Sequence, residues 1–162
     1  MHMNTVKEEN KDFLIEQYFL GRTTGYGTMH DFLGRLIAEV EIEMSGYWEK
    51  DIFILDEIFI FKSSKEQKRQ EQKRQWKIVK ESKYQYCATS NDLLKKASGI
   101  RKENTMNWKY QLLINYRNKE IAFDFDDWIY NSGDIVINKV KMKKFGIKLA
   151  ELFISYKKPP KS

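Results

Sequence analysis

The sequence contains little cysteine and little histidine. Among 162 residues, the single Cys87 has no partner for an intramolecular disulfide and no second thiolate for a zinc site. His2 and His30 are the only histidines, so a two-histidine metal centre is not expected, although carboxylates remain potential ligands for magnesium or calcium. We therefore predict no cofactor and name no metal ligands or catalytic residues.

Long hydrophobic runs are also absent. No apolar stretch approaches the roughly 20 residues that a membrane-spanning helix requires. The N-terminal segment has neither the apolar region nor the cleavage site of a signal peptide. The sequence as given therefore predicts a soluble, cytoplasmic protein.

Positive charge is in excess and unevenly distributed. The net charge is +6 and the isoelectric point is about 9.2, with basic residues concentrated in 62–83 and 139–161 and acidic residues in 31–57. Such an excess favours contact with phosphates or anionic lipid. Nucleic acid is not expected as a partner, because the aromatic residues interleaved with lysine at 108–110 fall on a face predicted to be buried.

Lys139, Lys141 and Lys143 recur at every second position and so line one outward face of a predicted strand. One interpretation is a solvated face that pairs with outward glutamates such as Glu39 and Glu41. The other is a patch that binds an anionic membrane surface. The sequence makes no prediction of the oligomeric state.

Runs with period-two alternation recur about every 10 to 14 residues, which indicates an antiparallel sandwich or barrel rather than a β-α-β fold. With this length we predict one all-β domain at residues 11–158 after a flexible segment at 1–10. It should form an up-and-down barrel of about eight to ten strands, because closure removes exposed sheet edges. A short helix capped by Asp12 should run to Phe19.

Strands are predicted at residues 22–30, 36–44, 52–61, 84–88, 93–100, 106–116, 122–130 and 135–142, with a last strand after Gly146. The first should be bent or closely approached at Gly25 and Gly27. The second should turn at either 45–46 or 49–51. The third is either continuous or interrupted by a bulge at 56–57. Residues 62–75 form either an exposed loop or the solvated half of a hairpin.

The hairpin at 122–142 provides the candidate site. If Phe125 points into the barrel, strict alternation brings Asp127 inward as well. The same alternation turns Trp128 and Tyr130 outward, whereas a bulge at Asp126 brings these two rings inside. In both cases a carboxylate lies near the interior, where it must be hydrogen-bonded or shift its pKa.

Other polar residues share the predicted inner face. Asn138 alternates in phase with Val136 and Val140, and Glu151 lies on the face of Leu149 in the last strand. Convergent polar groups in an aromatic-lined cavity are typical of a small-molecule site. The candidate ligand-binding residues are Trp108, Tyr110, Asp127, Trp128, Tyr130 and Asn138. The alternative is structural: the aromatic rings fill a core, and the polar groups terminate strands or satisfy the backbone.

Several segments together resemble a bacterial, largely proteobacterial, lipocalin-like family of unknown function. The most specific are the Phe-Asp-Asp-Trp-Ile-Tyr element at 125–130 and the Lys-Phe-Gly element at 144–146. The resemblance covers residues 13–158 and extends through segments 19–22, 25–27, 107–110 and 137–138.

The resemblance implies a calycin-type barrel with no established activity. Many relatives are exported lipoproteins with a lipid-modified cysteine near the N-terminus, which this sequence lacks. It also lacks the Gly-x-Trp start of true lipocalins. Relatives are often associated with genes that modify membrane fatty acids, which implies a fatty-acyl ligand.

Three functions follow from these observations. The first is binding of a small hydrophobic or fatty-acyl ligand inside the barrel. The second is an enzyme that acts on a lipid-related substrate through Asp127 or Asp126. The third is a peripheral adaptor that binds an anionic membrane or partner through the lysine face.

Overall fold

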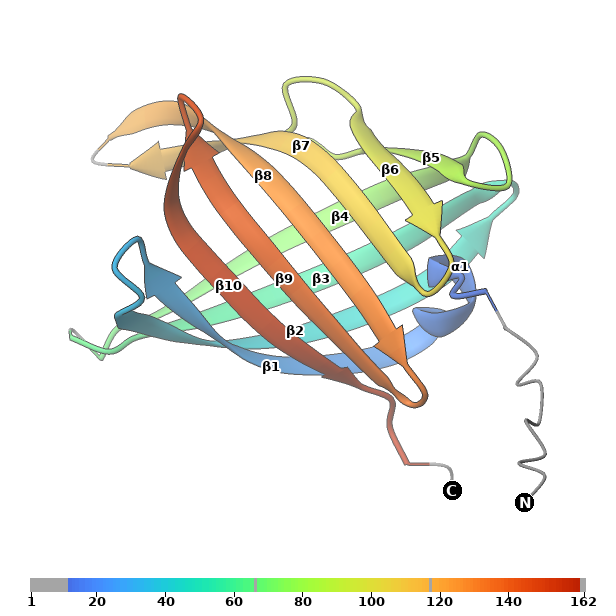
Figure 1. Cartoon of the computed structure of the whole chain (residues 1–162), viewed down its shortest axis with the longest axis horizontal. Helices are drawn as coiled ribbons and strands as arrows, with labels where there is room; N and C mark the ends of the chain where they lie inside the picture. Colours follow the sequence, from blue (N-terminus) through green and yellow to red (C-terminus); the bar gives the residue numbers. More distant parts are fainter. Residues whose placement is uncertain (1–11, 66, 117, 161–162) are drawn as a thin grey trace, which may run out of the picture.

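Ten antiparallel strands close into a barrel in the part of the chain that the structure describes. The computed structural model describes residues 12–65, 67–116 and 118–160, so the predicted flexible segment 1–10 lies outside it. Each strand pairs with the next along the chain, and β1 pairs with β10 to close the sheet (Figure 1). The predicted all-β, up-and-down, lipocalin-like barrel with a short N-terminal helix is confirmed.

The elements in chain order are α1 (Ile15–Tyr18), β1 (Gly21–Asp31), β2 (Leu36–Glu49), β3 (Ile52–Ser63), β4 (Arg69–Lys80), β5 (Gln85–Thr89), β6 (Ala97–Lys102), β7 (Thr105–Tyr116), β8 (Lys119–Ser132), β9 (Ile135–Lys144) and β10 (Ile147–Lys157).

Alternation of apolar and polar side chains explains which face each strand turns inward. In β2, Val40 and Ile42 are buried while Glu39 is exposed. The strand continues through Gly46 and turns at Lys50, which has a positive φ. Of the two predicted turns, the later one is therefore correct.

Strands β3 and β4 form a regular hairpin. It decides whether a bulge interrupts residues 56–57 and whether residues 62–75 form a loop or part of a hairpin. The register of β3 with both neighbours runs without a shift past Asp56 and Glu57, so no bulge forms there. Residues 69–75 belong to β4 and are mostly exposed, which confirms the solvated half of a hairpin. Strand β6 begins later than predicted, because Leu93 forms only an isolated bridge to Leu112.

The N-terminal helix is shorter than predicted. It begins after Leu14, without a side-chain cap, and Asp12 instead lies 3.4 Å from the guanidinium of Arg101. Ile15 and Phe19 are buried and cover one end of the barrel. Within the described ranges, no helix has the length and apolar character needed to cross a membrane.

Glycines allow β1 to approach β10 closely, as the sequence predicted. A Cβ added at Gly27 would lie 2.0 Å from the carbonyl oxygen of Phe153. A Cβ added at Gly25 would lie 2.9 Å from the ring of Tyr156. A side chain at Gly27 therefore requires the two strands that close the barrel to separate.

We predict that Gly27→Ala lowers the free energy of unfolding by about 2 to 3 kcal/mol, because the new methyl group meets backbone rather than a movable side chain. Thermal and urea unfolding monitored by circular dichroism measure the loss. Thr24→Ala, at a more open position of the same strand, is the control and should change stability by less than about 0.5 kcal/mol. Equal stability of Gly27→Ala and the original protein would contradict the close approach.

Candidate ligand-binding cavity

The barrel encloses a cavity of about 1040 Å³. It extends from Ile15 and Phe19 at the helix end to Ser63, Lys68 and Lys144 at the opposite end. We call this second end, formed by the turns β1–β2, β3–β4, β7–β8 and β9–β10 and the β5–β6 loop, the mouth. The volume lies at the upper end of the range of about 300–1000 Å³ that is typical of drug-sized ligands, so the cavity suits a long or bulky molecule.

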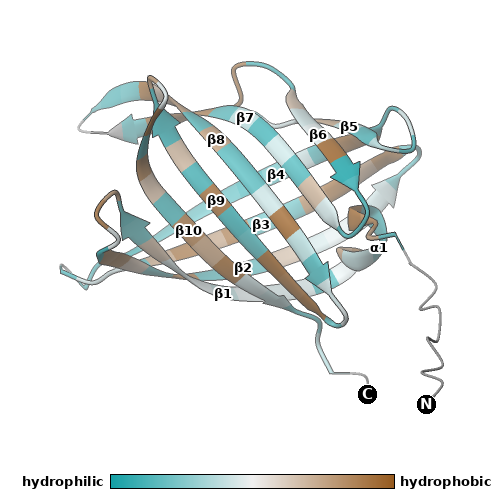
Figure 2. Ribbon diagram, in the orientation of Figure 1, coloured by the Kyte–Doolittle hydropathy of each residue, from teal (hydrophilic) through white to brown (hydrophobic). Residues whose placement is uncertain are grey.

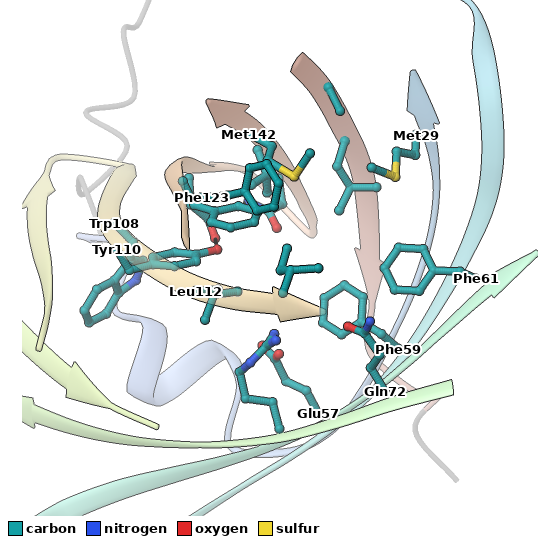
Figure 3. A pocket seen from close by; sticks show the side chains of 18 of the residues that line it. Met29, Glu57, Phe59, Phe61, Gln72, Trp108, Tyr110, Leu112, Phe123 and Met142 are labelled. Atoms are coloured by element: carbon teal, nitrogen blue, oxygen red, sulfur yellow. Dashed lines mark hydrogen bonds between the residues drawn. The ribbon is translucent and has the colours of Figure 1, made fainter. Parts of the chain in front are cut away.

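Aromatic rings form much of the wall. Tyr110 stacks on Phe125 with ring centroids 5.3 Å apart, and Trp76 meets the edge of Tyr110 at the same separation. Nearer the mouth, Phe59 stacks on Phe61 at 5.8 Å. Figure 3 shows side chains from strands β3 and β7 projecting into this one space. The wall is therefore apolar over most of its length.

A hydrogen-bonded band crosses the cavity at mid-depth around Asp127. The Tyr110 hydroxyl donates to Asp127 Oδ2 at 2.9 Å, and Asn138 Nδ2 donates to Asp127 Oδ1. Asn138 also donates to the carbonyl of Trp128 at 2.8 Å and accepts from the Tyr156 hydroxyl at 3.2 Å. These partners hold the carboxylate in one orientation, with both oxygens accepting hydrogen bonds.

Burial changes the protonation of this carboxylate. Removal from water raises the pKa of Asp127 to about 6, and the negative charge of Asp126 acts in the same direction. The hydrogen bonds from Asn138 and Tyr110 oppose the rise, because they stabilise the charged form. Asp127 is therefore poised to change its charge near neutral pH when a ligand alters its surroundings.

Glu57 adds a second buried carboxylate to the band. Desolvation raises its pKa to about 7, while the Arg74 guanidinium and a hydrogen bond from Trp76 favour the charged form. The charges of Asp127 and Asp92 raise the pKa further. The charge of Asp127 thus disfavours the ionisation of Glu57 across the cavity.

The guanidinium of Arg74 is already hydrogen-bonded to a carboxylate. It donates through Nε and Nη2 to Asp92, at 3.0 and 2.8 Å from Oδ2, and it lies 5.7 Å from the Trp76 ring centroid. This forked pairing with a carboxylate is strong and directional. The mid-depth band therefore presents acceptor oxygens to the cavity, rather than a free cation.

The mouth, in contrast, carries cations. Lys144 Nζ donates to the Ala122 carbonyl at 2.6 Å and lies 5.7 Å from the centroid of Phe123 and 5.0 Å from that of Phe145. Lys68 lines the same end. The electrostatic order along the cavity is therefore positive at the mouth and acidic at mid-depth.

Four of the six predicted ligand-binding residues line this cavity together: Trp108, Tyr110, Asp127 and Asn138. Trp128 and Tyr130 do not line it. Their rings stack on each other at 6.0 Å, with Tyr130 exposed. Because β8 keeps its register through residues 126–127, no bulge turns these two rings inward. The structure therefore places these two predicted residues outside the cavity.

Two other candidate acids lie away from the acidic groups at mid-depth, although Glu151 belongs to the cavity lining. Asp126 accepts a hydrogen bond from Asn107 at 2.8 Å. Glu151 forms ion pairs with Lys139 at 3.4 Å and with Lys148 at 3.2 Å. The register of β10 shifts between Lys148 and residue 150, which reverses the predicted phase of this strand.

Glu57 and Arg74 were missed as members of the site. Glu57 follows Phe53 and Leu55 in alternation, and Phe59 continues that inward face. This period-two pattern is the signal that predicts an inward Glu57. The position of Arg74 depends on the pairing of β3 with β4, which places it opposite Glu57.

No cluster of three or more histidine, cysteine, aspartate or glutamate side chains suited to a metal occurs within the described residues. His30 lies 2.9 Å from Thr28 Oγ1 and 3.2 Å from the Gly34 carbonyl, through its two ring nitrogens. Its contacts are local to the β1–β2 turn, away from the acidic band.

The fold and the cavity define a lipocalin-like barrel with a ligand-sized interior. The chain belongs to the DUF3833 family, described as a protein of unknown function, whose model matches residues 1–158. No curated protein matches the sequence. A similar solved structure is that of the S-type phycobiliprotein lyase CPES from Guillardia theta, with a TM-score of 0.66 and 8% identity, over 91% of this chain and 92% of that chain. At that identity the likeness shows the fold alone.

We predict that Glu57→Gln removes a pH-dependent loss of stability. The folded-state pKa of about 7 exceeds the ordinary value of 4.5, so the contribution of Glu57 is fully present below about pH 4.5 and is lost as the pH rises through 7. Glutamine resembles the protonated side chain. The variant should therefore gain about 1 to 3 kcal/mol over the original protein between pH 5 and pH 8.

Thermal melts across this pH range measure the difference. Glu39→Gln, on the exposed face of β2, is the matched control and should run parallel to the original protein at all pH values. A Glu57→Gln curve that also runs parallel would show that burial does not perturb this carboxyl group.

Proposed function

We propose that this protein binds an amphipathic ligand with an acyl chain, whose tail lies inside the barrel and whose anionic head lies at the mouth. The observation that carries the proposal is the order of charge along the cavity. Lys144 lies at the mouth, and the carboxyl groups of Glu57 and Asp127 lie at mid-depth between apolar walls.

The apolar walls supply the affinity. Burial of a methylene group contributes about 0.8 kcal/mol, so about ten buried methylenes contribute about 8 kcal/mol before the cost of association. Aromatic residues such as Phe59, Phe61 and Phe125 provide this surface at successive depths. A flexible chain can follow these apolar walls past the polar groups at mid-depth.

The acidic band sets the orientation. A carboxylate head placed deep in the barrel would meet Glu57 and Asp127, while Arg74 is held by Asp92 and offers no free charge. At the mouth, the head instead meets Lys144, with Lys68 in the same lining. A hydroxyl or N–H group partway along the ligand would donate to the acceptor oxygens of the band.

A planar ligand with N–H donors and peripheral carboxylates, such as a linear tetrapyrrole, is a second candidate. The stacked rings of Tyr110 and Phe125 offer a flat wall beside the acceptor oxygens of Asp127. The phycobiliprotein lyase of similar fold supports testing this class. The acyl ligand is preferred because the lining is apolar far beyond the reach of these two rings.

Catalysis by Asp127, the alternative from the sequence, is less well supported. Both of its oxygens accept hydrogen bonds, from Tyr110 and from Asn138. Each oxygen keeps one further acceptor position, which suits a hydrogen bond from a ligand. The arrangement suits a carboxylate that positions a ligand, and Asp126, the other candidate, lies outside the band.

Native mass spectrometry of the purified protein, followed by denaturing extraction, tests the proposal. We expect a co-purifying amphiphile with an acyl chain. Ala38→Trp should weaken its retention, because Ala38 is buried in the lining and an indole there obstructs part of the cavity. Glu39→Trp, on the outer face of the same strand, should keep it.

A thermal melt confirms that each variant remains folded. A tetrapyrrole in the extract would establish the second candidate instead. No bound molecule, together with no displaceable binding of a fluorescent fatty acid, would contradict ligand binding in the barrel.

We predict that Lys144→Gln weakens fatty-acid binding by about fivefold, because it removes the cation at the mouth. The corresponding fatty alcohol should bind equally well to both proteins, since its head carries no charge. Lys141→Gln, on the outer face of β9, is the control. Equal losses for the acid and the alcohol would show that the head does not lie at the mouth.

A further inference from the structure

The mouth of the barrel displays exposed apolar side chains on two turns. These apolar tips are Phe32 (62% exposed), Leu33 (62%), Phe145 (89%) and Ile147 (65%). The two turns are neighbours because β1 pairs with β10, with Asp31 opposite Ala150. Both turns are brown in Figure 2, at the end of the barrel opposite α1. Exposed apolar residues that gather in this way mark an interaction site.

Phe145 has a backbone conformation that bulky residues rarely adopt. Its φ is +52° and that of Gly146 is +75°, so the pair forms a tight hairpin turn in the left-handed region. Asn-Gly or Asp-Gly is favoured at such turns, and a bulky residue there is strained. Among the described residues, the other non-glycine positions with positive φ are all polar: Lys50, Gln67, Glu103 and Asn118. An exposed phenyl ring at this position points to a function for the ring.

Basic residues surround the apolar tips. The turns and strand ends at the mouth carry Arg35, Lys65, Lys68, Arg69, Lys95, Lys96, Lys119, Lys143, Lys144 and Lys148. The acidic residues of the same turns and strand ends are fewer among the described residues: Asp31, Asp92 and Glu120. Of the basic residues, Lys148 forms an ion pair with Glu151. Asp31 is bound by Arg35 at 2.8 Å, and Asp92 is bound by Arg74. The tips therefore project from a strongly positive rim.

The opposite end of the barrel provides a contrast. It also exposes apolar side chains, including Trp48 and Ile135. Acidic residues flank these side chains directly, with Glu49 after Trp48 and Asp134 before Ile135. Lys50 and Lys83 also lie at this end, so the charge around its exposed apolar residues is mixed, whereas basic residues predominate at the mouth.

We propose that the mouth docks onto an anionic phospholipid bilayer, with the four apolar tips inserted among the lipids and the basic rim against the phosphates. Two protruding turns suit a deformable lipid surface better than the preformed pocket of a protein. Each basic residue near an anionic leaflet contributes to the attraction, while aromatic and aliphatic tips bury apolar area. Docking in this orientation turns the opening of the cavity toward the lipid. The inference goes beyond the cavity proposal, because docking requires no bound ligand.

Flotation with vesicles tests the surface. We expect binding to vesicles of phosphatidylcholine with phosphatidylglycerol, weak binding to phosphatidylcholine alone, and weaker binding as sodium chloride increases. Leu33→Ser with Phe145→Ser should reduce binding by roughly tenfold or more, through lost apolar burial. The matched control, Trp48→Ser with Ile135→Ser at the opposite end, should retain full binding.

Other results would overturn the proposal. The protein could bind equally to vesicles with and without phosphatidylglycerol, or bind neither. The variant with Leu33→Ser and Phe145→Ser could also bind as well as the original protein. A third variant changes Lys139, Lys141 and Lys143 to Gln. If only this variant loses vesicle binding, the membrane contact lies on the lateral lysine face instead.

Ligand binding in the cavity and docking of the mouth onto a membrane can be tested independently. Ala38→Trp should retain less ligand and still float with vesicles. The Leu33 and Phe145 variant should keep its ligand in native mass spectrometry.

Discussion

The structure depends on the backbone pairing of β1 with β10. Without it, a ten-strand meander would leave two open edges and no enclosed interior. The pairing requires glycine at position 27, where the Phe153 carbonyl leaves no room for a side chain. Once the sheet is closed, the two-residue alternation of every strand becomes a division between a cavity and the solvent. The order of charge in the cavity and at its mouth is a consequence of this closure.

Desolvation gives the interior its chemical character. The same carboxyl groups on the outer face would be ordinary solvated acids, but inside the barrel burial raises the pKa of Glu57 to about 7 and that of Asp127 to about 6. Tyr110 and Asn138 compensate by donating hydrogen bonds to Asp127. A polar band of this kind costs stability in an otherwise apolar cavity, because burial penalises the charged form of each carboxyl group.

The predictions from the sequence succeeded where the alternating pattern that places a residue lies within a single strand. Asp127 and Asn138 were placed inside because alternation with apolar neighbours is local. Trp128 and Tyr130 were kept as candidates through a bulge that does not form. Glu57 was missed, although its own strand holds the alternating pattern that predicts it. Glu151 was expected on the face of Leu149, but the register of β10 shifts before residue 150, and its carboxylate pairs with Lys139 and Lys148.

The sequence by itself determined the all-β class, most strand positions, and the strip of lysines at every second residue of β9, since these depend on periodicity and turn residues close in the chain. Only the tertiary structure decided the register that sets Glu57 opposite Arg74, the hollow interior, and the placement of the Phe32 and Phe145 turns at the same end of the barrel. These features arise from the register between strands. Contacts between residues far apart in the chain fix that register, and no local pattern records them.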